Sequence, residues 1–143
     1  MSLNRPSLTC ARQPQRGKKY FSLEEANDAL SYVARVIEDV TSSYRRAVEL
    51  RKRMEEGGGA DDLDELRDDY EASMDRLNDL VDELQKANVE LKDFERGLID
   101  FPSVHEGREI CLCWHRGEST VQAWHEVDAG YAGRQDVALL QAG

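Results

Sequence analysis

The chain has 143 residues and a mass of 16.3 kDa, a size that fits one domain with a modest core. No apolar run approaches the length needed to cross a bilayer, and the N-terminus lacks the apolar stretch of a secretory signal. We therefore expect a cytoplasmic protein without membrane contact. Its three cysteines are odd in number and include no CxxC pair, which argues against a disulfide framework.

Charge is distributed unevenly along the chain. The formal net charge is −10, but residues 1–19 hold five basic residues and no acidic one, so setting those five aside leaves −15 for residues 20–143. A domain of that charge is poorly suited to neutralising phosphates, and we expect no nucleic-acid binding. The basic part contains Pro6, Pro14 and Gly17, a composition typical of disorder. We predict a disordered tail over residues 1–18 and a single domain over residues 19–143.

Two apolar stripes separated by glycines predict two long helices. Ser22 and Glu25 have the spacing of a capping box, with Phe21 before them as a hydrophobic staple, so the first helix is expected to begin there. The three glycines at 57–59 interrupt both stripes. The first stripe comprises Leu23, Ala26, Leu30, Val33, Ile37, Val40, Tyr44, Ala47, Arg51 and Met54. The second comprises Leu63, Leu66, Tyr70, Ser73, Leu77, Leu80, Leu84, Ala87 and Leu91.

Charge placement predicts how the two helices pack. The first helix ends in basic residues and the second opens with acidic ones, which suits both helix dipoles. In an antiparallel hairpin the two groups also lie beside each other. The basic group is Arg45, Arg46, Arg51, Lys52 and Arg53, and the acidic group is Asp61, Asp62, Asp64, Glu65, Asp68 and Asp69. We predict a coiled-coil-like antiparallel hairpin over residues 22–92.

The first helix has more apolar surface than one partner helix can cover. Near its start, a sheet can cover Ala29 and Val36. Near the tip, no other predicted element is available for Val48 and Leu50. We therefore predict a homodimer in which the first helices meet in a four-helix contact.

Short alternating runs after Leu91 predict a small three-stranded antiparallel sheet, so the expected fold class is α+β. Strands are expected at 98–101, 109–115 and 120–127, with a loop at 102–107, a turn at 116–119, and the whole segment spanning 93–136. A turn centred on Gly117 and Glu118 pairs Ile110 with His125. One face then carries Ile110, Leu112, Trp114, Val121 and Ala123 and packs on the helices. The other carries Cys111, Cys113, His115, Gln122 and Trp124.

Four side chains of this sheet are of the types that bind zinc, namely Cys111, Cys113, His115 and His125. Strand alternation places the first three on one face, but the predicted register puts His125 on the other, and only a bulge would reverse this. The spacing lacks paired ligand doublets, and cysteines commonly serve as small apolar residues. We therefore expect no metal and no other cofactor, with Cys111, Cys113 and His115 as the weaker alternative.

A second candidate is acid–base chemistry by His125 with Glu126 or Asp128, aided by His105. Because neighbouring residues of a strand point to opposite faces, His125 and Glu126 are not expected to act together. No serine or cysteine lies in a recognisable nucleophile turn. No residue is therefore identified as catalytic.

The third candidate is an anion-binding loop from Asp128 to Gln135. Gly130 and Gly133 allow backbone amides to turn inward, and Arg134 supplies a forked donor for carboxylate or phosphate. The spacing is not that of a Walker loop or a dinucleotide fingerprint. The favoured interpretation is structural, with Arg134 locking the sheet onto the helices. The carboxylates considered as its partners are Asp100, Glu126 and Asp128.

Several segments resemble one known family. They are KYFSLEEAN (Lys19 to Asn27), ERGLIDFP (Glu95 to Pro102), LCW (Leu112 to Trp114), GE (Gly117-Glu118) and WHEVDAGYAGRQ (Trp124 to Gln135). On these motifs the chain resembles the DUF2203 family of uncharacterised bacterial proteins over nearly all its length after the basic tail. The resemblance implies no activity and assigns no roles, but it directs attention to Arg96, Asp100, Cys113, Trp114, Trp124, His125, Glu126, Asp128 and Arg134. Cys111 and His115 depart from the pattern, which counts against a four-ligand metal site.

The leading hypothesis is a non-enzymatic homodimeric interaction module that presents a polar, aromatic-rich patch to an unknown protein or small-anion partner. The alternative is a small-ligand (anion) or metal-binding protein, or an enzyme, that uses the segment from Trp124 to Gln135. The candidate ligand-binding residues are Arg96, Asp100, Trp124, His125, Glu126, Asp128 and Arg134.

Overall fold

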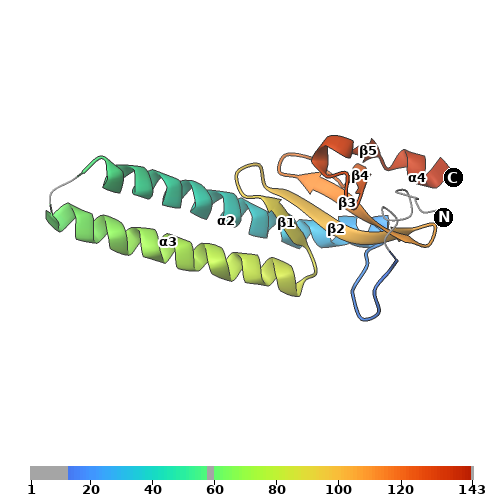
Figure 1. Ribbon diagram of the computed structural model, residues 1–143, viewed down its shortest axis with the longest axis horizontal. Coiled ribbons are helices and arrows are strands. Elements are labelled where there is room, and N and C mark those ends of the chain that lie inside the picture. The colour runs from blue at the N-terminus through green and yellow to red at the C-terminus, as the bar shows by residue number, and fades with distance from the viewer. Residues whose placement is uncertain (1–12, 58–59, 143) are drawn as a thin grey trace, which may run out of the picture.

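A computed structural model describes residues 13–57 and 60–142 and has two long helices followed by an antiparallel sheet (Figure 1). The fold class α+β is confirmed, but the sheet has five strands rather than three. The helices are α2 (Leu23–Glu55), α3 (Ala60–Lys86) and the short α4 (Ala138–Ala142), with a 3-10 turn η1 (Tyr131–Gly133). The strands are β1 (Glu90–Asp93), β2 (Leu98–His105), β3 (Arg108–His115), β4 (Ala123–Glu126) and β5 (Gln135–Asp136). No helix in the described ranges has the length and apolarity that crossing a bilayer requires.

The capping box at the start of α2 is confirmed. The Ser22 Oγ accepts from the Glu25 backbone N–H at 3.0 Å, and the Glu25 carboxylate accepts from the Ser22 backbone N–H at 2.9 Å. Phe21 is buried, its backbone N–H donates to the Pro102 carbonyl at 2.7 Å, and its ring meets Phe101 edge-on at 5.1 Å. The start of α2 is therefore fixed both by its own cap and by β2.

The antiparallel arrangement of α2 and α3 is also confirmed. Exposed ion pairs cross between the helices, with Arg46 at 3.8 Å from Asp69 and Arg76 at 3.4 Å from Asp39. Such exposed pairs add little stability, so the apolar seam holds the hairpin together. The hairpin projects well beyond the sheet, so the described residues near its tip lie away from the strands (Figure 1). Supercoiling of the two helices stays a prediction.

Leu50 differs from its expected position. It is fully buried (0% exposed) within the hairpin, whereas Val48 is 50% exposed. The seam near the tip runs through Ala47, Leu50 and Met54, while Arg51 points to solvent. The expectation that Leu50 needs a second subunit to cover it is therefore wrong, because a step of three residues keeps it facing α3.

The second helix ends earlier than the apolar stripe suggests. Asn88 adopts the left-handed conformation (φ 62°), and the N–H groups of Asn88 and Val89 donate to the carbonyls of Gln85 and Leu84, each at 3.0 Å. This is a Schellman motif, which ends α3 at Lys86 and turns the chain into β1. Leu91 therefore belongs to a strand, although its spacing also fits the helical stripe.

The strands follow one another in the order β1-β2-β3-β4-β5. The predicted loop at 102–107 is wrong, because β2 continues to His105 and pairs with Arg108 across a two-residue turn. Glu106 (φ 52°) and Gly107 (φ 76°) form that turn, and positive φ at both central positions is the geometry that matches strand twist.

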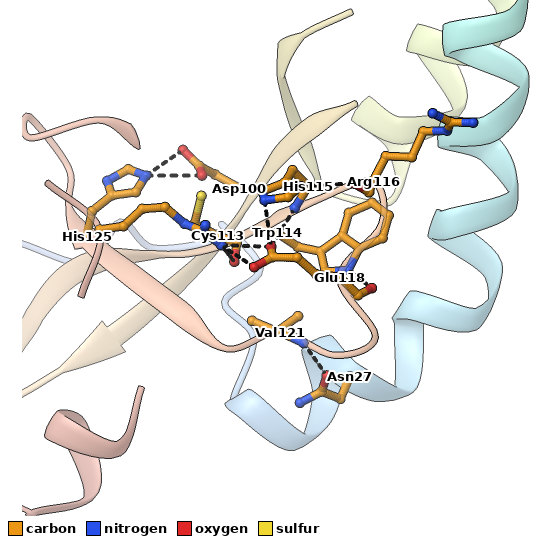
Figure 2. Close-up of polar contacts among 10 residues, drawn as sticks. Asn27, Asp100, Cys113, Trp114, His115, Arg116, Glu118, Val121 and His125 are labelled. Carbon is orange, nitrogen blue, oxygen red and sulfur yellow. Dashed lines mark hydrogen bonds and ion pairs between the residues drawn. The ribbon is translucent and has the colours of Figure 1, made fainter. Parts of the chain in front are cut away.

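The predicted register between β3 and β4 is wrong by one residue. Cys111, not Ile110, pairs with His125, and Leu112 pairs with Trp124. The connection at 116–122 is longer than a tight turn because it reaches α2, where the Val121 backbone N–H donates to the Asn27 Oδ1 at 2.7 Å (Figure 2). Trp124 therefore faces the core, and Ala123 and His125 lie on the opposite face with Cys113.

The main core lies between the helices and one face of the sheet. That face carries Ile99, Phe101, Ile110, Leu112, Trp114 and Trp124. Arg116 adds a forked ion pair to Glu38 of α2, with N···O distances of 2.6 and 2.8 Å, and thereby ties the sheet to the helices. Val36 is buried in this core and Ala29 packs against it, as expected.

Most of the predicted tail lies outside the described residues. Within the described part, the Lys18 ammonium lies 2.7 Å from the Glu109 carboxylate, and the Tyr20 hydroxyl donates to the same group at 2.9 Å. Lys18 and Tyr20 thus contact β3 through Glu109.

Candidate functional site

Three neighbouring strands each contribute one polar side chain to the face of the sheet opposite the helices. Asp100 of β2 pairs directly with Cys113 of β3, and His125 of β4 lies diagonally across from Cys113. Because alternate residues of a strand share a face, the observed register places all three side chains together. The Cys113 sulfur points toward the space between Asp100 and His125 (Figure 2).

The three side chains form a tight and buried cluster, here called the Asp–Cys–His cluster (Asp100, Cys113, His125). The His125 Nε2 lies 3.1 Å from both carboxylate oxygens of Asp100. One ligand atom from each residue can be chosen so that all lie within 4.8 Å of one another. Their exposed fractions are 2%, 0% and 2%. Among the described residues, this is the one group of three or more histidine, cysteine and acidic side chains with such spacing.

A second hydrogen bond fixes the His125 ring. Its Nδ1 lies 2.7 Å from the Glu126 carbonyl, which can only accept, so Nδ1 carries a hydrogen. Nε2 is then the nitrogen that faces both Asp100 and Cys113. A nucleophile–histidine–aspartate relay needs its two partners on different ring nitrogens, so this arrangement is not such a relay.

Without a metal ion, a proton on Nε2 satisfies Asp100. Burial alone lowers the pKa of His125, but hydrogen bonds with Asp100, Cys113 and the Glu126 carbonyl outweigh it and raise the pKa to about 10. Burial, together with the charges of Asp100 and Glu90, raises the pKa of the neighbouring Cys111 thiol to about 12. Cys111 is therefore protonated at neutral pH and is a poor nucleophile.

A pocket of about 240 Å³ opens over the cluster. Its other lining residues are Lys92, Leu98, Val127, Gly130 and Tyr131. Larger hollows of about 390 and 570 Å³ lie between α3 and β1 and at the hairpin tip. Neither is lined by a histidine or a cysteine, whereas the smaller pocket is lined by one of each.

Tyr131, on one wall of the pocket, is held by two arginines. The guanidinium carbons of Arg96 and Arg134 lie 5.3 and 4.9 Å from its ring centroid. Arg134 also donates to both carboxylate oxygens of Glu118 at 2.7 and 2.9 Å. The expected partners of Arg134, namely Asp100, Glu126 and Asp128, are therefore wrong. Arg134 ties the C-terminal segment to the β3–β4 connection, not the sheet to the helices.

The remaining predicted site residues lie elsewhere. Glu126 is on the helix-facing side and binds Arg108 at 3.0 and 2.6 Å, which lowers the pKa of Glu126. Trp124 is in the core, and His105 lies near it with ring centroids 6.4 Å apart. Asp128 is exposed. None of these groups reaches His125, so the proposed acid–base pairs do not form.

The ligands expected for a metal ion, Cys111, Cys113 and His115, do not come together in the structure. His115 turns its Nδ1 to the Arg116 carbonyl at 2.9 Å, and Cys111 lies beside the cluster rather than in it. Asp100 takes their place. The sequence does contain a signal for Asp100, which is a single acidic residue between the apolar residues Ile99 and Phe101. A carboxylate buried in a strand needs a partner, so this position marks a candidate site residue.

The fold and cluster thus define a small α+β protein with a buried polar site on the outer face of its sheet. A family model described as "Uncharacterized conserved protein (DUF2203)" matches residues 19–137, and the chain belongs to this family. No curated protein and no solved structure matches the chain.

Proposed function

We propose that the protein binds a divalent transition metal ion, zinc in the first instance, through the Asp–Cys–His cluster. The observation that carries this proposal is the convergence of a carboxylate, a thiol and an imidazole nitrogen, all buried, on one point. These are the three side-chain types that zinc prefers. Metal binding was the weaker alternative of the sequence, and the observed register favours it.

Ring orientation supports the same proposal. A metal-binding histidine usually donates its other ring N–H to a carbonyl or carboxylate, which aims the free nitrogen at the ion. His125 has this arrangement, with the Glu126 carbonyl 2.7 Å from Nδ1 and with Nε2 toward the cluster.

Spacing and charge are also suitable. Tetrahedral zinc bonds of about 2.0–2.3 Å require ligand atoms roughly 3.3–3.8 Å apart. The 3.1 Å separation between Nε2 and the Asp100 oxygens is slightly short of this range, and the 4.8 Å limit for the whole set extends beyond it, so the side chains must adjust around a bound ion. A doubly charged cation is balanced by the carboxylate and the Cys113 thiolate, with His125 neutral.

The competing explanation is a structural ion pair. A protonated His125 and Asp100 satisfy each other, and Cys113 then serves as a small apolar residue. The two explanations differ in the role of the Cys113 sulfur. It binds the ion as a thiolate in the metal site, whereas it takes no part in the ion pair.

Metal analysis of the full chain separates them. The protein is purified without chelator, and bound zinc is measured together with the thiolate-to-cobalt absorption of cobalt-loaded samples. We expect about one metal ion per chain, lost in Cys113→Ser, and retained in the matched control Cys111→Ser, which alters the neighbouring cysteine on the same strand and face. Zinc content that is negligible in the wild type, or equal in both variants, contradicts the proposal.

Homodimer formation through the first helix stays a separate prediction. The prediction was based on two apolar residues near the tip, Val48 and Leu50. Leu50 is buried within the hairpin, so only Val48, which is 50% exposed, still supports the prediction. Sedimentation of the wild type and of Val48→Glu tests it. A dimer that dissociates in the variant supports it, and a monomeric wild type at micromolar concentration contradicts it.

A further inference from the structure

The pocket above the Asp–Cys–His cluster is the natural place for an additional metal ligand. Three protein ligands leave one position of a tetrahedral zinc ion open. The same three residues line the pocket although each is at most 2% exposed, so the pocket meets the cluster at its edge. An exogenous group in this pocket can therefore reach the ion.

One cation and three apolar side chains line the rest of the pocket. Lys92 is the cation, and its ammonium lies 3.1 Å from the Glu90 carboxylate in a pair whose side chains are 47% and 42% exposed. Such an exposed pair is weak and exchanges readily with another anion. The apolar contribution comes from Leu98, Val127 and the ring of Tyr131.

We propose that the pocket binds a short-chain monocarboxylate, with one carboxylate oxygen on the metal and the other on the Lys92 ammonium. This inference rests on the proposed metal site. The short aliphatic part of the ligand packs against Leu98, Val127 and Tyr131. At about 240 Å³ the pocket is below the usual size of drug-like sites, so the ligand has only a few carbon atoms.

The charged residues around the pocket favour a ligand with one negative charge over a ligand with two. Asp100 lies in the pocket wall and Glu90 flanks Lys92, so the lysine is a single cation among carboxylates. Arg134 is engaged by Glu118, and neither Arg134 nor Arg96 is among the residues that line the pocket. A phosphate dianion therefore finds too few donors here.

The arginines instead position the apolar wall. Stacking of Arg96 and Arg134 on the Tyr131 ring holds it beside the cluster, where it limits the length of the ligand. We expect propionate to bind more tightly than acetate because it buries additional apolar carbon, and octanoate to bind poorly because it exceeds the pocket.

The experiment titrates cobalt-loaded full-length protein with acetate, propionate, octanoate and inorganic phosphate, and follows the visible cobalt spectrum. We expect a saturable change with propionate. Lys92→Met should weaken propionate binding about tenfold with unchanged metal content, because one charge-assisted hydrogen bond is lost. The matched control Lys86→Met removes the same charge from an exposed residue at the end of α3, outside the pocket, and should change nothing.

The outcomes are distinguishable. A metal-loaded protein whose spectrum ignores propionate, or whose propionate binding is equal in wild type and Lys92→Met, overturns the carboxylate proposal and leaves the metal site standing. Phosphate binding as tight as propionate overturns the ligand class. Absence of metal from wild-type protein overturns both proposals.

Discussion

The two faces of the sheet are both buried, but by different means. On the helix-facing side, Ile110, Leu112 and Trp114 of β3 belong to one apolar core with residues of α2 and α3. On the outer side, Cys113 of the same strand lines a pocket with Gly130 and Tyr131 of the C-terminal segment, next to a buried acid and a buried histidine. A stable fold requires only the first face. The polar groups of the second cost desolvation, and this cost suggests that the outer face is where function lies.

The largest expected effect is on the helix-facing side. Phe101→Ala should lower the free energy of unfolding by about 3–5 kcal/mol, because it leaves a cavity in the main core. Urea denaturation measures the change. Val104→Ala on the same strand is the matched control, since Val104 is 41% exposed, and should change stability by less than about 0.5 kcal/mol. Equal effects would contradict the assignment of the core.

On the outer face, the metal-free protein should be sensitive to loss of a charge partner. Asp100→Asn leaves the His125 imidazolium buried without its counterion and should cost about 3 kcal/mol. The double variant Asp100→Asn/His125→Gln replaces the ion pair by neutral groups and should recover much of that loss. Urea denaturation with chelator present tests both, and a double variant less stable than the single one would show that charge pairing is not the cause.

The same pair predicts a pH dependence of the metal-free protein. Because folding raises the pKa of His125 from 6.5 to about 10, the stability from its protonated form is fully present below pH 6.5 and is lost as pH rises through 10. The difference in unfolding free energy between wild type and His125→Gln should therefore shrink by about 4 kcal/mol between pH 7 and pH 10.5. A constant difference over this range would contradict a raised pKa.

A smaller effect is expected where the C-terminal segment covers the outer face. Arg134→Met removes the two bonds to Glu118 and one cation from Tyr131, and should cost about 1–2 kcal/mol. Amide hydrogen exchange should quicken over residues 129–136 and stay unchanged in α2 and α3. Arg96→Met, which removes the other cation from the same ring but breaks no bond to Glu118, is the comparison and should quicken exchange less.

The helical hairpin could be predicted because its signals are local. Ser22 and Glu25 form the cap that their spacing indicates, and the opposite charges at the helix ends indicate the antiparallel arrangement that the structure has. The length of α3 could not be read from the stripe because Leu91 fits both a helical and a strand period. Asn88, which ends α3 in a left-handed conformation, was the signal available.

The site could be predicted only in part because its register depends on a contact distant in sequence. Cys113 and His125 share a face because the 116–122 connection extends to Asn27 of α2. The predicted four-residue turn at 116–119 takes no account of this contact, because Asn27 is far away in the sequence. Asp100 was recognisable as a motif position, but its role follows only from the pairing of β2 with β3. The sequence also predicts the wrong partner for Arg134, because its actual partner Glu118 lies in this same connection.

X-ray absorption at the zinc edge of the purified wild-type protein tests the central claim most directly. The metal site proposed on the outer face predicts one sulfur neighbour at about 2.3 Å, with nitrogen and oxygen neighbours at about 2.0–2.2 Å. The sulfur should disappear in Cys113→Ser and persist in Cys111→Ser. A zinc shell of nitrogen and oxygen alone in the wild type, or a sulfur neighbour that survives Cys113→Ser, would contradict the Asp–Cys–His cluster as a metal site.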